Sequence, residues 1–71
     1  MKYKVIMQKG DEKTTYRSDD YMKAFEKFND NCGSMWNTVE FYEGDKCIRK
    51  GEFWKEGNLR KGRVFTPEGQ A

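Results

Sequence analysis

The sequence predicts a single α+β domain in which one helix packs on one face of an antiparallel β-sheet. Two stretches rich in β-forming residues precede a segment with helical periodicity and two more follow it, which gives the order β-β-α-β-β. Both pairs of β-rich stretches are joined by a Gly-Asp dipeptide, the loop chemistry of a tight hairpin. Eleven aromatic residues supply the buried area that a chain with 37% charged residues needs to form a core. The pattern is also compatible with a fifth strand at the C-terminal end.

The first hairpin is predicted from residues 2–9 and 12–17, joined by Gly10 and Asp11. Glycine suits the first central position of a two-residue loop because that position needs a positive φ. A loop at these two residues also sets the register of the strands. The expected pairs are Val5 with Tyr16, Met7 with Thr14 and, on the opposite side of the ribbon, Lys4 with Arg17.

Residues 19–32 are predicted to form the helix. Ser18 is the expected N-cap, and Asp19 and Asp20 follow in the first turn, where the helix dipole favours acidic side chains. Gly33 is expected to stop the helix, because glycine readily adopts the left-handed conformation found after the C-cap. The apolar stripe that defines the helix comprises Tyr21, Ala24, Phe25, Phe28 and Cys32.

Residues 35–43 and 46–54 predict the second hairpin, with Gly44 and Asp45 as its loop. Gly51 interrupts the second of these strands and is the expected β-bulge. An unbroken register counted from the loop pairs Tyr42 with Cys47, Phe41 with Ile48 and Glu40 with Arg49.

Residues 59–66 are the candidate for a fifth strand, after a turn signal at residues 56–58. One domain is expected over residues 1–66, with residues 67–71 as a frayed tail. Residues 51–69 are also similar to a single MORN repeat, in the glycine after a short Glu-Phe run and in the Pro-x-Gly end. One such unit cannot bury its own face, so we interpret the similarity as hairpin chemistry.

Enzymatic chemistry is not expected. The chain has no histidine, which removes the commonest general base and metal ligand, and its paired carboxylates lie at predicted turns or at the helix start. Cys32 and Cys47 are isolated and are expected to be free thiols on opposite sides of the sheet. Lys46 and Arg49 are close enough in sequence to lower the pKa of Cys47. We expect no cofactor and no metal.

The most informative feature is the sheet face that the helix leaves open. The helix is expected to cover the side that carries Val5, Met7, Val39, Phe41 and Ile48. The opposite side then carries Lys4, Ile6, Thr15, Arg17, Trp36, Thr38, Glu40, Tyr42, Cys47 and Arg49. Because Trp, Tyr and Arg dominate interface hot spots, the predicted binding residues on this face are Trp36, Tyr42, Arg17 and Arg49. The alternative is that the C-terminal segment or a second copy covers the aromatic residues.

A basic block extends this surface. Residues 46–63 carry seven basic and two acidic side chains, a net charge of +5, whereas residues 1–45 have a net charge of −2. Such a block can meet an acidic protein surface or a phosphate backbone. Its candidate contact residues are Lys50, Lys55, Arg60, Lys61 and Arg63.

These features favour binding over catalysis. We expect a protein that docks on a larger host or regulatory protein and regulates or inhibits it. The alternatives are single-stranded nucleic-acid binding by the aromatic and basic face, and sequestration of a small anionic nucleotide by a homodimer. In size, charge and aromatic content the chain resembles the small accessory proteins of bacteriophages, which implies inhibition of a host enzyme or defence system. No stretch has signal-peptide or transmembrane character, so we expect a cytoplasmic protein without a membrane partner.

Overall fold

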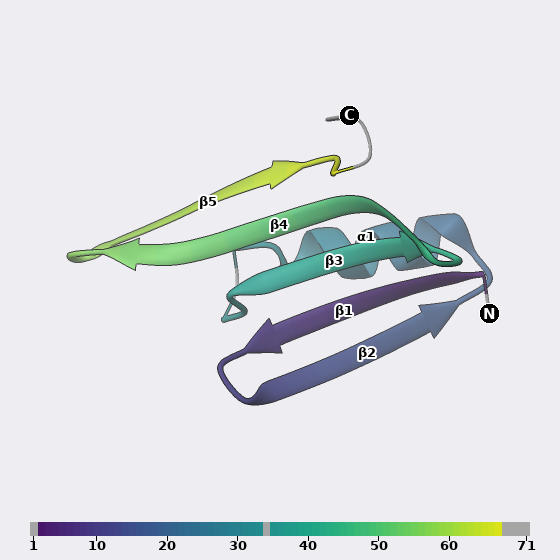
Figure 1. Cartoon of the computed structure of the whole chain (residues 1–71), viewed down its shortest axis with the longest axis horizontal. Helices are drawn as coiled ribbons and strands as arrows, with labels where there is room; N and C mark the ends of the chain where they lie inside the picture. The colour runs from purple at the N-terminus through teal and green to yellow at the C-terminus, as the bar shows by residue number, and fades with distance from the viewer. Residues whose placement is uncertain (1, 34, 68–71) are drawn as a thin grey trace.

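The computed structural model describes residues 2–33 and 35–67, which form five strands and one helix (Figure 1). The elements in chain order are β1 (Tyr3–Lys9), β2 (Glu12–Ser18), α1 (Tyr21–Asn31), β3 (Thr38–Glu43), β4 (Lys46–Glu56) and β5 (Leu59–Phe65). All strand pairs are antiparallel, and the strand order in the single sheet is β2-β1-β3-β4-β5. The α+β class, the helix on one face and the fifth strand are therefore confirmed. The predicted frayed tail lies, apart from Pro67, outside the described residues.

Glycine-led loops set the registers of the hairpins. Gly10, Gly44 and Gly57 each open a two-residue loop and have φ values of 56°, 62° and 61°. The register of the first hairpin is the predicted one, with Val5 opposite Tyr16. The third hairpin uses the same chemistry in its Gly57-Asn58 loop, which places β5 beside β4.

The helix begins two residues later than predicted, because Asp20 and not Ser18 is its N-cap. The Asp20 carboxylate accepts hydrogen bonds from the backbone N–H groups of Met22 and Lys23, at 2.9 and 3.4 Å. Ser18 instead ends β2, and its hydroxyl oxygen accepts a hydrogen bond from the backbone N–H of Asp20. At the other end, Gly33 follows the C-cap with a φ of 76°, as expected.

Phe41 lies at the centre of the core. It is fully buried, and its ring lies 5.6–6.3 Å from four other rings, one on β1 and three on α1. Such contacts add about 0.5–1.5 kcal/mol each beyond the area that they bury. The four rings belong to Tyr3, Tyr21, Phe25 and Phe28. Val5, Met7, Ala24 and Val39 complete the buried cluster between helix and sheet.

The bulge in the second hairpin lies at Ile48 and not at Gly51. Tyr42 is opposite Cys47 as predicted, but Phe41 is opposite Arg49, so Ile48 is the extra residue. The predicted pairs of Phe41 with Ile48 and of Glu40 with Arg49 are therefore wrong. Because the bulge reverses the alternation, Arg49 lies on the helix side, with its guanidinium 5.5 Å from the ring centre of Phe25. Its predicted place on the open face is wrong for the same reason.

Trp36 is a core residue, and its predicted place on the open face is also wrong. β3 starts at Thr38, so Trp36 lies in the preceding loop and is not bound by the alternation of the strand. Its side chain is only 9% exposed and packs in the core, and its indole N–H donates a 3.0 Å hydrogen bond to Oδ1 of Asn31. Trp36 is therefore buried as a member of the core cluster, and not as an open-face residue that another segment covers.

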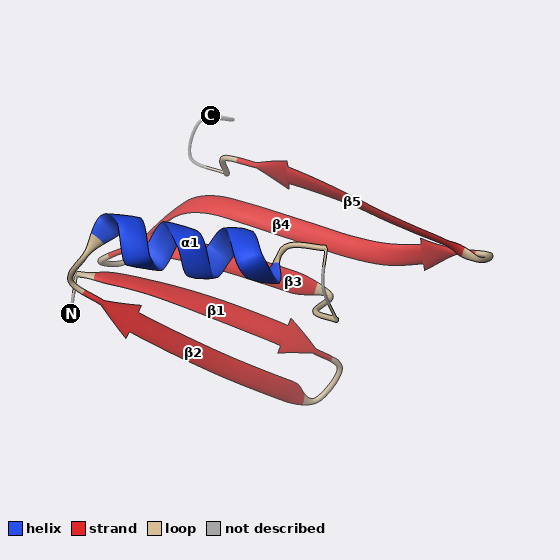
Figure 2. Ribbon diagram, turned by 180° about the vertical axis from the view of Figure 1, so that it is seen from behind, coloured by secondary structure: helices blue, strands red, loops and turns tan. Residues whose placement is uncertain are grey.

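The helix covers only part of the sheet. In the described residues, the backbone of α1 lies close to β1, β2 and β3 and not to β4 or β5. Figure 2 shows the helix lying across one face of the sheet, well away from β5. β3 pairs with β4 only as far as Glu52, whereas β4 continues to Glu56. The outer half of the β4–β5 hairpin, residues 54–61, therefore projects beyond the other strands (Figure 1). We call these residues the arm.

The two tryptophans provide a test of this core. Trp36→Phe removes the hydrogen bond to Asn31 and leaves unfilled space, so we expect it to lower the free energy of unfolding by about 1–2 kcal/mol. Trp54→Phe changes an exposed arm residue and should alter it by less than about 0.5 kcal/mol. Urea unfolding followed by circular dichroism measures both, and equal losses would contradict the burial of Trp36.

Candidate binding surface

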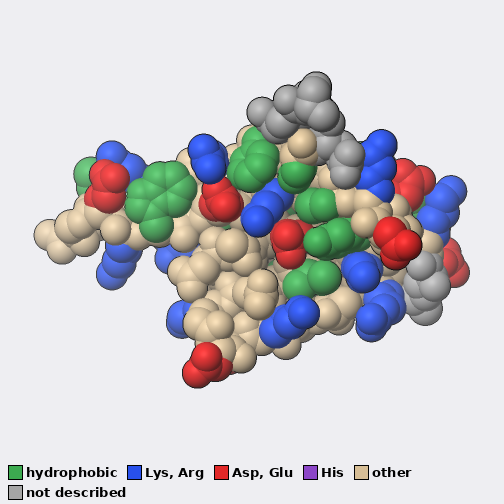
Figure 3. Space-filling model, in the orientation of Figure 1, with side chains coloured by type: hydrophobic (Ala, Val, Ile, Leu, Met, Phe, Trp, Pro, Cys, Tyr) green, Lys and Arg blue, Asp and Glu red, His purple; other side chains and the backbone are tan. Residues whose placement is uncertain are grey.

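The open face of the sheet carries a small group of half-buried hydrophobic side chains with charges of both signs around them (Figure 3). By strand register the hydrophobic side chains come from four strands: Ile6, Tyr42, Cys47 and Phe65. Arg17 lies on the same face opposite Lys4, as predicted. The ammonium of Lys4 lies 5.0 Å from the ring centre of Tyr42, so the open face contains a cation–π pair between the neighbouring strands β1 and β3.

A row of alternating charges crosses this face from β5 to β3. The guanidinium of Arg63 donates two hydrogen bonds to Oε1 of Glu52, at 2.8 and 3.0 Å. Lys50 lies between two carboxylates, with its Nζ 4.0 Å from Glu52 and 3.8 Å from Glu40. Lys50 and Arg63, two residues of the predicted basic block, thus lie on the open face, and their charges are balanced within the chain.

The two titratable groups in the middle of the face are held in their neutral forms. Burial and the nearby Glu40 carboxylate raise the pKa of Tyr42, whose hydroxyl donates a 3.5 Å hydrogen bond to that carboxylate. Burial also raises the pKa of the Cys47 thiol, and the charge of Glu40 adds to this effect. The expectation that Lys46 and Arg49 lower the pKa of Cys47 is wrong, because burial and Glu40 outweigh the lowering effects of the Lys50 charge and of the backbone hydrogen bonds at Arg49 and Phe41. At neutral pH this thiol is a poor nucleophile.

The arm exposes two large apolar side chains on its open-face side. Trp54 is 41% exposed and Leu59 is 66% exposed. Both lie on the same side of the hairpin, since Trp54 is opposite Lys61 and Leu59 is opposite Glu56. Nζ of Lys61 lies 2.8 Å from the carboxylate of Glu56, so this side of the arm is apolar with a closed ion pair.

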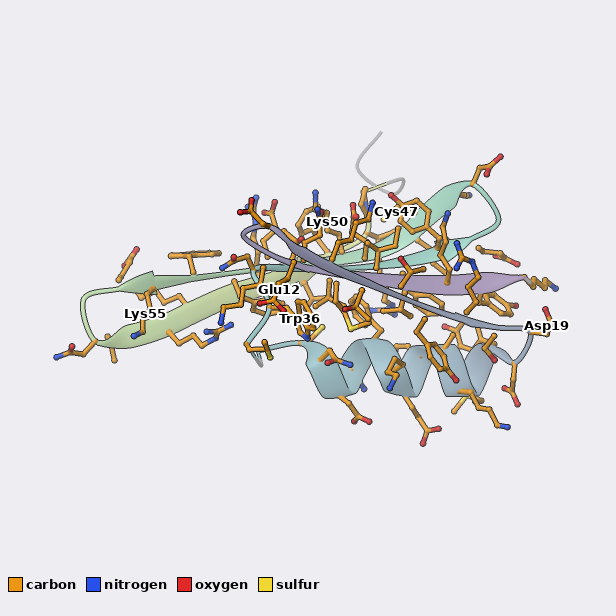
Figure 4. The ribbon with its side chains drawn as sticks, turned by 90° about the horizontal axis from the view of Figure 1, so that it is seen from below. Glu12, Asp19, Trp36, Cys47, Lys50 and Lys55 are labelled. Carbon is orange, nitrogen blue, oxygen red and sulfur yellow. The ribbon has the colours of Figure 1, made fainter. Side chains whose placement is uncertain are left out.

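The opposite side of the arm is basic. Lys55 and Arg60 face each other across the two strands, and Figure 4 shows Lys55 on the helix side of the sheet, with Lys50 and Cys47 on the other side. Like charges directly opposite each other destabilise an antiparallel pair. Neither residue has an acidic partner within the described part of the chain, although Arg60 donates a 3.0 Å hydrogen bond to the carbonyl oxygen of Trp36. The arm therefore holds two uncompensated cations close together.

A hollow of about 390 Å³ lies beside the arm, on the helix side of β5. Phe53 forms its apolar wall, and its ring packs against two glycines. A Cβ built on Gly51 would lie 2.8 Å from the ring, and one built on Gly62 would overlap Cδ1 of Phe53. Gly51 is therefore required for close approach of the ring and not for a bulge. Arg60 and Val64 complete the part of the hollow that lies along β5.

The structure thus divides the predicted binding residues into three groups. Tyr42, Arg17, Lys50, Lys61 and Arg63 lie on the open face, and Lys55 and Arg60 lie on the opposite side of the arm. The third group lies on the helix side of the sheet: Trp36 belongs to the core, and Arg49 is exposed beside the ring of Phe25. Trp54, Leu59 and Phe53 were not predicted as site residues from the sequence. The side-chain alternation of β4 from Lys50 to Trp54 could have placed Trp54 on the open face, but the arm itself depends on the unequal lengths of β3 and β4.

No group of three or more acidic or cysteine side chains in the described part of the chain is arranged to hold a metal ion. Within the same residues no helix is long and apolar enough to cross a membrane. No protein-family model matches the chain, and neither a curated protein nor a solved structure matches it.

Gly62→Ala tests how the hollow is built. The added methyl group would overlap the Phe53 ring and lie 3.1 Å from the carbonyl oxygen of Glu52, so we expect a loss of about 1–3 kcal/mol in the free energy of unfolding. In a Phe53→Ala background the same substitution should cost clearly less, because the ring is gone and only the contact with the Glu52 carbonyl oxygen remains. A double-mutant cycle by urea unfolding measures this coupling, and additive effects would refute the ring–glycine contact.

Cys32 gives the fold a dependence on alkaline pH. Burial raises the pKa of its thiol to about 11 from an ordinary value of 9.0. The unfolded chain therefore loses this proton first, so the stabilisation from the neutral thiol is complete below pH 9.0 and is lost as the pH rises toward about 11. We expect Cys32→Ala to lose less stability than wild type between these two pH values. Parallel pH profiles of unfolding free energy would contradict this.

Proposed function

We propose that this chain is a small binding protein that docks through its arm on a larger protein and regulates or inhibits it. The observation that carries the proposal is the exposure of Trp54 and Leu59 on a hairpin that projects beyond the rest of the sheet. Tryptophan is among the residue types that dominate binding energy at interfaces, and a projecting hairpin can enter a recess on a partner. The backbone of the arm lies away from the helix, since neither β4 nor β5 has its Cα atoms close to α1.

The charge of the arm supports an acidic partner. Lys55 and Arg60 repel each other across the hairpin, and an acidic surface would relieve that repulsion on docking. Oppositely charged surfaces also raise the rate of encounter, most strongly at low salt. The basic residues that the sequence pointed to would therefore act mainly on association rate, and the apolar arm residues on the lifetime of the complex.

The arrangement of charges favours a protein over a nucleic acid. Lys50, Lys61 and Arg63 each lie within 4.0 Å of a glutamate, so only part of the open-face positive charge is free to meet phosphates. Base stacking also needs accessible rings beside free cations. Tyr42 is half-buried and already engaged by Lys4.

Inhibition by occlusion is the role that we propose, in line with the resemblance to small phage proteins that block a host enzyme or defence system. A chain of 71 residues can cover a standard-sized site on a larger protein without changing it chemically. We also propose a cytoplasmic location, because Cys32 and Cys47 are free thiols and lie on different sides of the sheet.

The test is capture of a partner from nuclease-treated bacterial lysate by tagged protein. We expect wild type to retain one protein at stoichiometric level, and the Trp54→Ala/Leu59→Ala double variant to retain it at least about tenfold less. Met22→Ala is the matched control, because Met22 is 61% exposed but lies on the helix, away from the arm. It should capture the partner as wild type does.

Three outcomes would contradict the proposal. Capture that disappears with nuclease treatment would indicate nucleic-acid binding. Equal capture by the double variant would remove the arm from the interface. If the captured protein is an enzyme and saturating amounts of the chain leave its activity unchanged, the inhibitory role is wrong.

A further inference from the structure

β5 has a free outer edge. It pairs with β4 on one side, and no strand in the described part of the chain pairs with its other side. In a hairpin with a two-residue loop, the residues that flank the loop exchange hydrogen bonds and alternate residues follow them. Leu59, Lys61 and Arg63 therefore bond to β4, and the backbone groups of Arg60, Gly62 and Val64 point outward. The alternation on β4 agrees, because the N–H of Phe53 donates away from β5, to the carbonyl oxygen of Asn37 at 2.8 Å.

The hollow lies along this same edge. Arg60, Gly62 and Val64 line it from β5, and Phe53 provides its apolar wall. Since strand side chains alternate between faces, a strand added to β5 would direct every second side chain to the helix side, over the hollow. The edge thus offers backbone hydrogen bonds together with a place for an apolar side chain, which are the two components of recognition by strand addition.

The positive charge of the outer β5 edge favours an acidic partner strand over a second copy of this chain. Residues 59–65 contain three basic residues and no acidic residue. Two copies joined antiparallel about Gly62 would place Lys61 of one copy opposite Arg63 of the other, so pairing with a second copy is disfavoured. The other free edge, β2, differs: residues 12–18 contain acidic Glu12 among the basic residues, and the hollow beside β2 is lined by both acids and bases.

We infer that the outer edge of β5 binds an extended acidic segment of the docked protein as a sixth strand of the sheet, with an apolar side chain of that segment in the hollow against Phe53. This inference rests on the proposed function, because the segment belongs to the protein that the arm binds. An acidic side chain near the segment's end would meet Arg60, which has no acidic partner in the described chain. Acidic side chains on the other side of the added strand would face Lys61 and Arg63, which already pair with Glu56 and Glu52, so the main charge attraction comes from Arg60.

The probe is a synthetic peptide, acetyl-SVEFEES-amide, which places Phe opposite Gly62 and glutamates opposite Arg60, Lys61 and Arg63 when it pairs antiparallel with β5. Its control is acetyl-SVKFKKS-amide, which keeps the apolar side chains and reverses the charges. Binding is followed by NMR at low ionic strength, where charge attraction is least screened. Amide hydrogen exchange then reports on each backbone N–H.

The acidic peptide should bind and the basic peptide should not. Bound acidic peptide should slow exchange by at least about tenfold at Arg60, Gly62 and Val64, with little change at Lys61 and Arg63, whose N–H groups already bond to β4. Val64→Pro removes one outward N–H at an edge position that tolerates proline, and should weaken binding about tenfold. Val64→Ala keeps the N–H and should bind within about twofold of wild type.

Several results would overturn the inference: no binding of the acidic peptide, equal binding of the basic peptide, binding without slowed exchange at the alternate amides, or normal binding by folded Val64→Pro. If that variant does not fold, the exchange pattern of wild type decides alone. Trp54→Ala should leave peptide binding unchanged, because Trp54 lies on the opposite side of the arm from the hollow. If the peptide does not bind but capture from lysate depends on the arm, the added strand is refuted and the proposed function stands. If the peptide binds but capture does not depend on the arm, the proposed function is refuted.

Discussion

One helix of eleven residues has to cover a sheet of five strands, and the rest of the structure follows from this constraint. The helix places its aromatic side chains over Phe41, so the buried core forms where β1 and β3 lie beneath it. β4 adds only the partly buried Ile48 and Phe53 beside that core, and no residue of the core cluster comes from β5. The stability of a domain this small therefore depends on about half of its chain.

The part of the sheet that the helix does not cover differs between the open face near the core and the arm. Near the core, the open face closes itself with a row of ion pairs from Arg63 to Glu40 and with the half-buried Tyr42 and Cys47. Farther out, the arm has no such closure: one side exposes Trp54 and Leu59, and the other opposes two cations. A small chain that keeps apolar and like-charged groups exposed in one place gives up stability there, and local departures from good packing are where binding sites are expected.

Most of the fold could be predicted because local signals agreed with one another. Glycine-led loops fixed two hairpins, and the stripe from Tyr21 to Cys32 fixed the helix and its covered face. The site was harder to predict. Trp36 was misplaced because a loop residue is free of strand alternation, and Arg49 because one extra residue at Ile48 reverses alternation without any sequence signal. Gly51 drew the bulge prediction to itself, although its lack of a side chain serves the ring of Phe53. The arm depends on strand lengths, which are the least certain part of any pattern.

The arm stands apart from the helix-covered core and can open independently of it. Native-state hydrogen exchange of the free protein, measured by NMR across low urea concentrations, tests this claim most directly. Val5 and Phe41 are fully buried residues of the neighbouring strands β1 and β3, so their amides should exchange only through global unfolding and depend steeply on urea. The amides of Trp54 and Lys61 should exchange much faster, through local opening that urea hardly affects. If arm and core amides instead share one exchange free energy and one urea dependence, the arm is an integral part of the folded unit and the account is wrong.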